Sequence, residues 1–308
     1  MRLIDNMKNR LSLIVTIIVI SLLIISVYNI HLVGEGDNKE ADKEYELKGV
    51  SAKGQTQAIT YKRQLKLSEK IPSMPRHPLV ELYEEIEQTI SQKIIEVKDN
   101  NIIKVERKYL KSNLNLLEKK PSSKPDALNG KAINIEIKGG EVKADTKDKI
   151  SDDIKKNVAP DENNFLLLLP AGKVKPDDKW KVVSATALSV FNFTTTRARG
   201  YHHRALDPGI KPRFDEAEVV CTLKEVKKIK GDDTAIIEIQ GVLKADEEGL
   251  KETVTLSGTA YFLVAKGKFN KLDFEANISI GGTQPCSNGQ PSAVEGSGTM
   301  KLTVEFKQ

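Results

Sequence analysis

The sequence predicts a mainly β protein of the α+β class, with one N-terminal transmembrane helix. The expected fold is a large antiparallel, curved sheet or two-layer β domain with about two short helices. Three observations favour this class: apolar and polar side chains alternate along most of the chain, clear helical spacing is confined to short segments, and an uncharged apolar run lies near the N-terminus. A chain of 308 residues can bury a core without disulfide bonds.

The apolar run begins at Leu11 and carries no charge through Val27. Three basic residues precede it and acidic residues dominate after it. Because Lys and Arg are retained on the cytoplasmic side, we expect the N-terminus inside and the rest of the chain outside. A helix over 11–27 spans about 25 Å, so the span must extend to residue 33 to cross an apolar core of about 30 Å.

We therefore expect a cytoplasmic n-region over 1–10, a transmembrane signal anchor over 11–33, an acidic tether over 34–44 and an extracytoplasmic antiparallel β domain over 45–308. The predicted location is a bacterial cell membrane with a single span and the bulk of the chain periplasmic. The alternative is a cleaved signal and a secreted protein, although no small-residue cleavage site follows the run. A buried core helix fits poorly because the run is apolar on every face.

Period-2 alternation predicts strands in both halves of the β domain. The segments are 59–67, 133–137, 217–223, 235–243, 254–264, 272–280 and 301–307. Segment 80–97 is ambiguous, because its apolar residues repeat every four positions and fit a helix stripe and a strand alike. The turn-forming residues 99–101 favour a hairpin for the later half of that segment. Two helices are predicted between the strand regions, one over about 150–158 and one over about 161–169 that ends before Pro170.

The segment LLLLPAGKVKPDDKW, residues 166–180, resembles a signature of exported or membrane-anchored bacterial β-rich proteins of unknown function. In that signature a Leu-Pro is followed by a Val, an acidic residue and a Trp that opens a strand, here Pro170, Val174, Asp178 and Trp180. The residue before the acidic one is usually Gly, whereas this chain has Asp177. The resemblance implies an antiparallel β protein of the bacterial envelope and transfers no catalytic residue.

Segment 197–213 concentrates basic side chains. Its candidate anion-binding patch comprises Arg197, Arg199, His202, His203 and Arg204, since guanidinium groups suit phosphate and carboxylate. A solvated loop between two strands is the alternative. A metal site fits poorly, because adjacent histidines in a strand point to opposite sides and no further Cys or His is spaced to complete a shell. We expect no metal and no cofactor.

Cys221 and Cys286 are an even pair in an oxidising compartment, so a disulfide between them is one prediction. The alternative is a free thiol at Cys221, which lies on the apolar side of a predicted strand. Trp180 either stacks on a ligand or anchors the start of its strand against the helices. Asp177 and Asp178 are predicted to be turn and cap residues.

The sequence contains no phosphate-binding glycine loop, no G-x-S-x-G, no H-E-x-x-H and no paired C-x-x-C. Its 48 basic and 43 acidic residues are interleaved, so nucleic acid is not an expected partner. We predict a non-catalytic envelope module that binds an apolar or anionic ligand, such as a lipid, or an envelope protein. The alternatives are a structural spacer or assembly factor and, third, a hydrolase. A continuous apolar cavity between sheet and helices would favour ligand binding, and a packed core would favour a spacer.

Overall fold

The computed structural model describes residues 43–70, 79–98, 101–117, 124–125, 127–138, 141–150, 165–191, 214–247, 249–285 and 291–307. The chain divides into two units, Met1–Lys43 and Glu44–Gln308. The predicted n-region 1–10 and anchor 11–33 lie outside the described residues, as does the tether 34–44 except for its last two residues. In the described ranges, no helix is long and apolar enough to cross a membrane.

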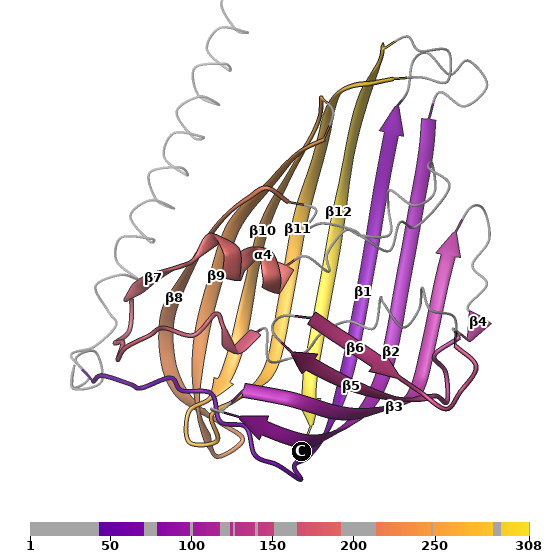
Figure 1. Cartoon of the computed structure of the whole chain (residues 1–308). Helices are drawn as coiled ribbons and strands as arrows, with labels where there is room; N and C mark the ends of the chain where they lie inside the picture. Colours follow the sequence, from indigo (N-terminus) through magenta and orange to yellow (C-terminus); the bar gives the residue numbers. More distant parts are fainter. Residues whose placement is uncertain are drawn as a thin grey trace, which may run out of the picture. The chain divides into compact units, whose positions relative to one another are not determined.

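A single antiparallel sheet accounts for most of the described structure (Figure 1). Its order is β6-β5-β3-β2-β1-β12-β11-β10-β9-β8-β7, and β4 pairs with β3 off this path. The strands are β1 Thr56–Lys70, β2 Leu79–Lys98, β3 Asn101–Leu117, β4 Lys124–Pro125, β5 Ala132–Lys138, β6 Glu141–Asp145, β7 Lys179–Val182, β8 Glu216–Ile229, β9 Asp232–Glu247, β10 Leu250–Leu263, β11 Lys268–Pro285 and β12 Pro291–Lys307.

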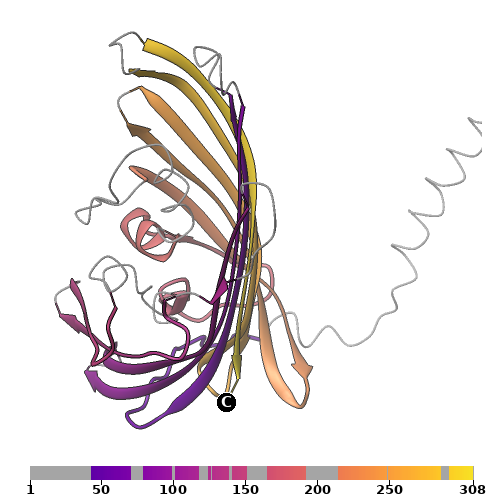
Figure 2. The ribbon, with the colours of Figure 1, turned by 90° about the vertical axis from the view of Figure 1, so that its right-hand side faces the viewer.

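The sheet curves, and the helix α4 (Ser184–Phe191) lies on its concave side (Figure 2). Successive side chains of a strand point to opposite faces, so every second residue of each long strand faces the concave side. On β11, for example, Leu272, Phe274 and Ala276 are buried while the residues between them are more exposed. The concave face is therefore the core of this unit.

Gly258 on β10 permits a close approach between two neighbouring strands. A Cβ atom at this position would overlap the ring of Phe274 and the backbone oxygen of Asp273 on β11. Because glycine has no side chain, the ring of Phe274 lies directly over the β10 backbone. Glycines at such positions allow a sheet to bend sharply.

The prediction of a mainly β, antiparallel, curved sheet is confirmed, and the described structure holds one sheet and not two layers. The ambiguous segment 80–97 is strand throughout. Of the predicted helix 161–169, only Phe165 and Leu166 are helical among the described residues, and turns follow them. The predicted helix 150–158 lies outside the described residues apart from Ile150.

The helix α4 is not among the predicted helices, which were expected over about 150–158 and about 161–169. Its buried residues Ala187, Val190 and Phe191 lie three and four positions apart, as on one face of a helix. Eight residues make only about two turns, which is too short for helical periodicity to stand out in the sequence.

Candidate functional site

The concave face over β8–β12 is an apolar wall covered by two short elements. Phe274 lies at its centre, with the ring of Phe165 stacked on it at 6.3 Å between centroids and the ring of Phe191 edge-on at 5.5 Å. Phe191 belongs to α4, and Phe165 belongs to the helical turn before Pro170. The rings of Phe165 and Phe191 therefore occupy the concave side of Phe274.

The signature residues Pro170, Val174, Asp178 and Trp180 build the corner that holds the helical turn against the sheet. The Trp180 Nε1 donates a hydrogen bond to the Leu168 carbonyl oxygen at 2.7 Å. Val174 forms a two-way backbone bridge with Tyr45, and both side chains are buried. Pro170 directly follows the turn. These contacts agree with an anchoring role for Trp180.

The turn before Trp180 contains a residue other than glycine in the left-handed region. Asp177 has a φ of 69°, in the left-handed region that glycine adopts without strain and that Asp tolerates. Asp178 accepts a hydrogen bond from the Lys175 backbone N–H at 2.9 Å through its carboxylate. Both aspartates therefore act within the turn, as predicted for turn and cap residues.

The concave face over β1–β3 carries buried polar side chains between its apolar ones. Arg63 donates a hydrogen bond to the Glu84 carboxylate, and both side chains are almost fully buried. Arg107 Nε donates to Gln92 Oε1 at 2.6 Å in the same region. Burial by itself would lower the pKa of Arg63, but Tyr61 and Glu84 outweigh it and raise this pKa. Arg63 is therefore a cation held inside the core.

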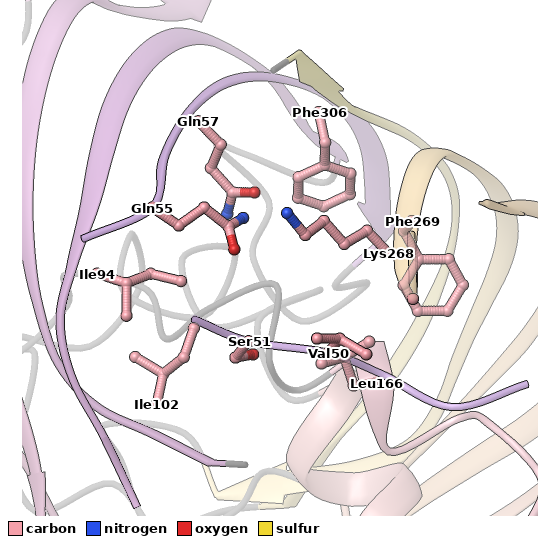
Figure 3. Close-up of a pocket in the computed structure, with 11 residues that line it drawn as sticks. Val50, Ser51, Gln55, Gln57, Ile94, Ile102, Leu166, Lys268, Phe269 and Phe306 are labelled. Atoms are coloured by element: carbon pink, nitrogen blue, oxygen red, sulfur yellow. The ribbon is translucent and has the colours of Figure 1, made fainter. Parts of the chain in front are cut away.

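A small pocket lies at one end of the concave face, where β1 and β11 begin and β12 ends (Figure 3). Its cavity volume is about 30 Å³. We call it the end pocket. Its lining residues are Val50, Ser51, Gln55, Gln57, Ile94, Ile102, Leu166, Gly267, Lys268, Phe269 and Phe306.

The segment before β1, residues 44–55, crosses the end pocket and is here called the strap. The Val50 N–H donates to the Gly267 carbonyl oxygen at 2.8 Å, which fixes the strap to the β10–β11 turn. On the other side, the Ile94 N–H donates to the Gln55 carbonyl oxygen at 2.8 Å, which fixes it to β2. The strap thus joins two distant strands of the curved sheet and contributes polar residues to the pocket.

The end pocket combines apolar walls with convergent polar groups. Figure 3 shows the amide groups of Gln55 and Gln57 and the Lys268 ammonium group pointing into the same space. Ile94, Ile102 and Phe306 are buried members of the core that line this space. Burial, together with the nearby charge of Lys266, lowers the pKa of Lys268. Pockets for small molecules have this composition, with mostly apolar walls and a few polar groups that orient the ligand.

The anion patch Arg197, Arg199, His202, His203 and Arg204 lies outside the described residues, so it stays a prediction. Where the structure describes the chain, no cluster of three or more His, Cys, Asp and Glu side chains could hold a metal ion.

Cys221 is a free, fully buried thiol on β8, and burial raises its pKa to about 12. Cys286 lies outside the described residues. The strand register places Cys221 level with Ile239, Gly258 and Phe274. Pro285, which precedes Cys286, follows Phe274 by eleven residues, or about 36 Å of strand. A disulfide requires Cα atoms within about 7 Å, so this register favours the alternative of a free thiol over the predicted bond.

The sequence reasoning missed Gln55, Gln57 and Lys268, which come from two remote segments. One signal was available for Gln57 and Arg63, because both occupy the apolar side of the alternation that runs through Ile59 and Leu65. A polar residue on the apolar side of a strand pattern must find a buried partner or line a pocket. Lys268 offered no such signal, since it stands at the start of its strand.

No protein-family model matches the chain, and no curated protein matches it. Among solved structures, the chain is similar to one described as "lipid-protein interactions in lipovitellin", with 9% identity and a TM-score of 0.39 over 83% of this chain and 26% of that one. The chain thus spans about a quarter of that protein. DynF from the dynemicin biosynthesis pathway of Micromonospora chersina (5% identity, 84% of each chain) and the outer membrane channel DcaP of Acinetobacter baumannii (7% identity, 83% and 99%) each give a TM-score of 0.18. Similarities of this size do not establish a shared fold.

Proposed function

We propose that the protein is a non-catalytic binding module of the bacterial envelope that takes a small amphiphile at the end pocket. In this proposal, residues 11–33 anchor it in the membrane and the β unit lies outside the cytoplasm. The end pocket supports the proposal, because its buried apolar walls meet convergent polar groups where the strap closes the concave face. An amphiphile satisfies both kinds of surface at once.

The packing over Phe274 limits the size of the ligand. Phe165 and Phe191 occupy the centre of the apolar wall, so a ligand chain cannot lie there while these rings are in place. The proposed ligand therefore occupies the end of the concave face and not its full length.

A structural spacer is the second candidate function. The observation in its favour is the same aromatic packing of Phe165 and Phe191 on Phe274. The strands are also long, and β2 has 20 residues. A spacer needs a stiff, well-packed body and no ligand.

Two measurements on the full chain separate these functions: native mass spectrometry for a co-purified amphiphile, and thermal unfolding with and without added dodecanoate. We expect a bound mass or a rise in the unfolding temperature, because a ligand that binds only the folded state stabilises it. Ser51→Phe should abolish both effects by filling the pocket from the strap, whereas Ala52→Phe, at the exposed neighbouring residue, should preserve them. A chain with no bound mass and no change in unfolding temperature would support the spacer.

A further inference from the structure

The strap is held to the rest of the β unit at separated points. Backbone hydrogen bonds attach it along its length, and the residue pairs they join are Tyr45–Val174, Val50–Gly267 and Gln55–Ile94. The strand β1, which follows the strap, is instead paired with β12 on one side and with β2 on the other along almost its whole length. A segment that is paired at intervals opens locally at a lower free energy than a strand with continuous pairing on both sides.

The strap is buried near its beginning and exposed towards its end. Tyr45 and Leu47 are 8% and 3% exposed, whereas Val50, Ala52 and Lys53 are exposed. Burial of apolar area is the main favourable term in packing, so Tyr45 and Leu47 supply much of the free energy that holds the strap in place. We therefore expect the loss of one of these side chains to loosen the strap and leave the sheet intact.

Glycines on both sides of the contact let the strap fit closely against the β unit. A Cβ atom at Gly49 would lie 2.9 Å from the Leu166 side chain. A Cβ atom at Gly267 would lie 2.7 Å from the Lys48 carbonyl oxygen and 2.6 Å from the Val50 side chain. These separations are too short for a real Cβ atom, so a methyl group at Gly267 would push the strap outwards.

The strap forms one wall of the end pocket. Val50, Ser51 and Gln55 line the pocket from the strap, and the buried core residues Ile102 and Phe306 line it from the sheet (Figure 3). The cavity volume of about 30 Å³ is therefore the volume with the strap in place. If the strap detached, the core residues of this wall would be exposed to solvent.

We propose that the strap is a latch: residues 44–55 detach as one unit while the sheet stays folded, and their detachment opens the end of the concave face. The Tyr45–Val174 bridge is the attachment nearest in sequence to the N-terminal unit Met1–Lys43, so tension on that part of the chain acts on this bridge first. The latch goes beyond the proposed function, because it is a property of the fold and does not depend on a ligand.

The test is labelling of the full chain with N-ethylmaleimide under native conditions, in a variant with Ile102→Cys and Cys286→Ser. Ile102 is 5% exposed and lines the pocket, so its replacement thiol reports on the detached strap. Cys221, which is fully buried on β8 and does not line the pocket, reports on unfolding of the sheet. We expect the Ile102→Cys thiol to react at least about tenfold faster than Cys221, because local opening costs less free energy than global unfolding.

The first pair of variants acts on the fit of the strap. Gly267→Ala should raise the labelling rate of the Ile102→Cys thiol about tenfold, because the added methyl group overlaps the strap. Gly231→Ala is the matched control: its φ of 91° is also in the left-handed region, but its added methyl group meets no atom within 4 Å. Gly231→Ala should leave the rate unchanged.

The second pair acts on the burial of the strap. Leu47→Ala should raise the same labelling rate at least about tenfold, because it removes a buried side chain from the strap alone. Leu67→Ala is the matched control, since Leu67 is 6% exposed on β1 and its loss weakens the sheet without touching the strap. Leu67→Ala should leave labelling of the Ile102→Cys thiol unchanged.

Two results would overturn the latch. Equal labelling rates of the Ile102→Cys thiol and Cys221 would show that the strap detaches only when the sheet unfolds. A control variant that raises labelling as much as its partner would show the same. Circular dichroism checks the fold of each variant, and either pair decides the question if a member of the other pair does not fold. Because no ligand is added, failure of the latch and failure of the proposed function are distinguishable.

Discussion

The two halves of the concave face bury different chemistry. Over β8–β12 the wall is almost wholly apolar and is covered by aromatic rings. Over β1–β3 it carries five of the eight polar side chains that are buried in the described ranges. These five are Arg63, Glu84, Gln92, Arg107 and Ser112, and the other three are Thr222, Thr234 and Glu252.

We therefore expect the two halves to contribute to different properties: the β8–β12 half to the stability of the fold and the β1–β3 half to the choice of strand register. Burial of apolar area is the main favourable term in folding, so the β8–β12 half should contribute more to stability. A buried ion pair such as Arg63–Glu84 often adds little net stability, because both charges lose their water. A shift of either strand by one residue in register would turn its own charge out to the convex face and leave the other charge buried alone, so the pair helps to select the native register.

The largest expected effect is in the apolar half. Phe274→Ala should lower the free energy of unfolding by about 3–5 kcal/mol, because it removes the ring that Phe165 and Phe191 contact and leaves a cavity. Urea unfolding followed by circular dichroism measures this change. Asn277→Ala, at an exposed position of the same strand, should change stability by less than about 0.5 kcal/mol. A loss at Phe274 no larger than that of the control would show that the apolar wall is not the stabilising half.

The second effect tests the polar half. Glu84→Leu should destabilise by about 3–5 kcal/mol because it leaves Arg63 charged and buried. The double variant Arg63→Met with Glu84→Leu should recover most of this loss, since neither charge of the pair remains. If the double variant is as unstable as Glu84→Leu alone, the pair stabilises the fold directly and the contrast between the halves is wrong.

A third, smaller effect is the pH dependence of the free energy of unfolding that arises from the Cys221 thiol. Burial raises the pKa of this thiol to about 12, so the folded chain keeps the proton between pH 9 and 12 while the unfolded chain loses it. The unfolded state then binds fewer protons, and stability should fall with rising pH by about 1.4 kcal/mol per unit in that window. Denaturant unfolding at pH 8 and pH 10 measures the slope in a Cys286→Ser background. Cys221→Ala should flatten it, and an equal slope in both proteins would contradict the burial of the thiol.

The smallest effect concerns the opposite face of the same strands. Glu87 is an exposed partner of Lys111 and Lys62, and the hydrogen bond from Lys111, followed by that from Lys62, lowers its pKa. Its contribution should be present at neutral pH and disappear as the pH falls through this lowered pKa. Glu87→Gln should therefore lose about 0.2–1 kcal/mol at pH 7, less in 1 M NaCl, and nothing at pH 2. A loss as large as that of Glu84→Leu would show that burial does not distinguish the two ion pairs.

The contrast between the halves also explains where the sequence was ambiguous. On β2, the register places Leu82, Glu84, Ile86, Gln88 and Ile90 on the same concave face. Apolar and polar residues alternate within that face, so apolar side chains recur every four residues and imitate a helix stripe. In the apolar half nearly every inward position is apolar, Glu252 on β10 being an exception, and segments such as 272–280 were predicted as strands without ambiguity. Buried polar residues that pair across strands therefore interrupt the apolar alternation by which a strand is recognised in a sequence.

The candidate site was harder to predict than the fold. Gln55 and Gln57 lie at the start of β1, and Lys268 lies at the start of β11, more than 200 residues later in the chain. Sheet order and curvature bring these strand ends together, and neither can be read from local periodicity. The basic segment 197–213, which the sequence did single out, lies outside the described residues.

The sequence by itself located many of the strands and the buried side of each of these, because alternation is a local consequence of backbone geometry. It also located the turn and the start of a strand at Trp180, because both lie within fifteen residues of the chain. Only the tertiary structure decided the order of the strands, the strand assignment of 80–97, the helix α4 and the end pocket. Each of these depends on contacts between residues far apart in the chain, whose free energy no local pattern contains.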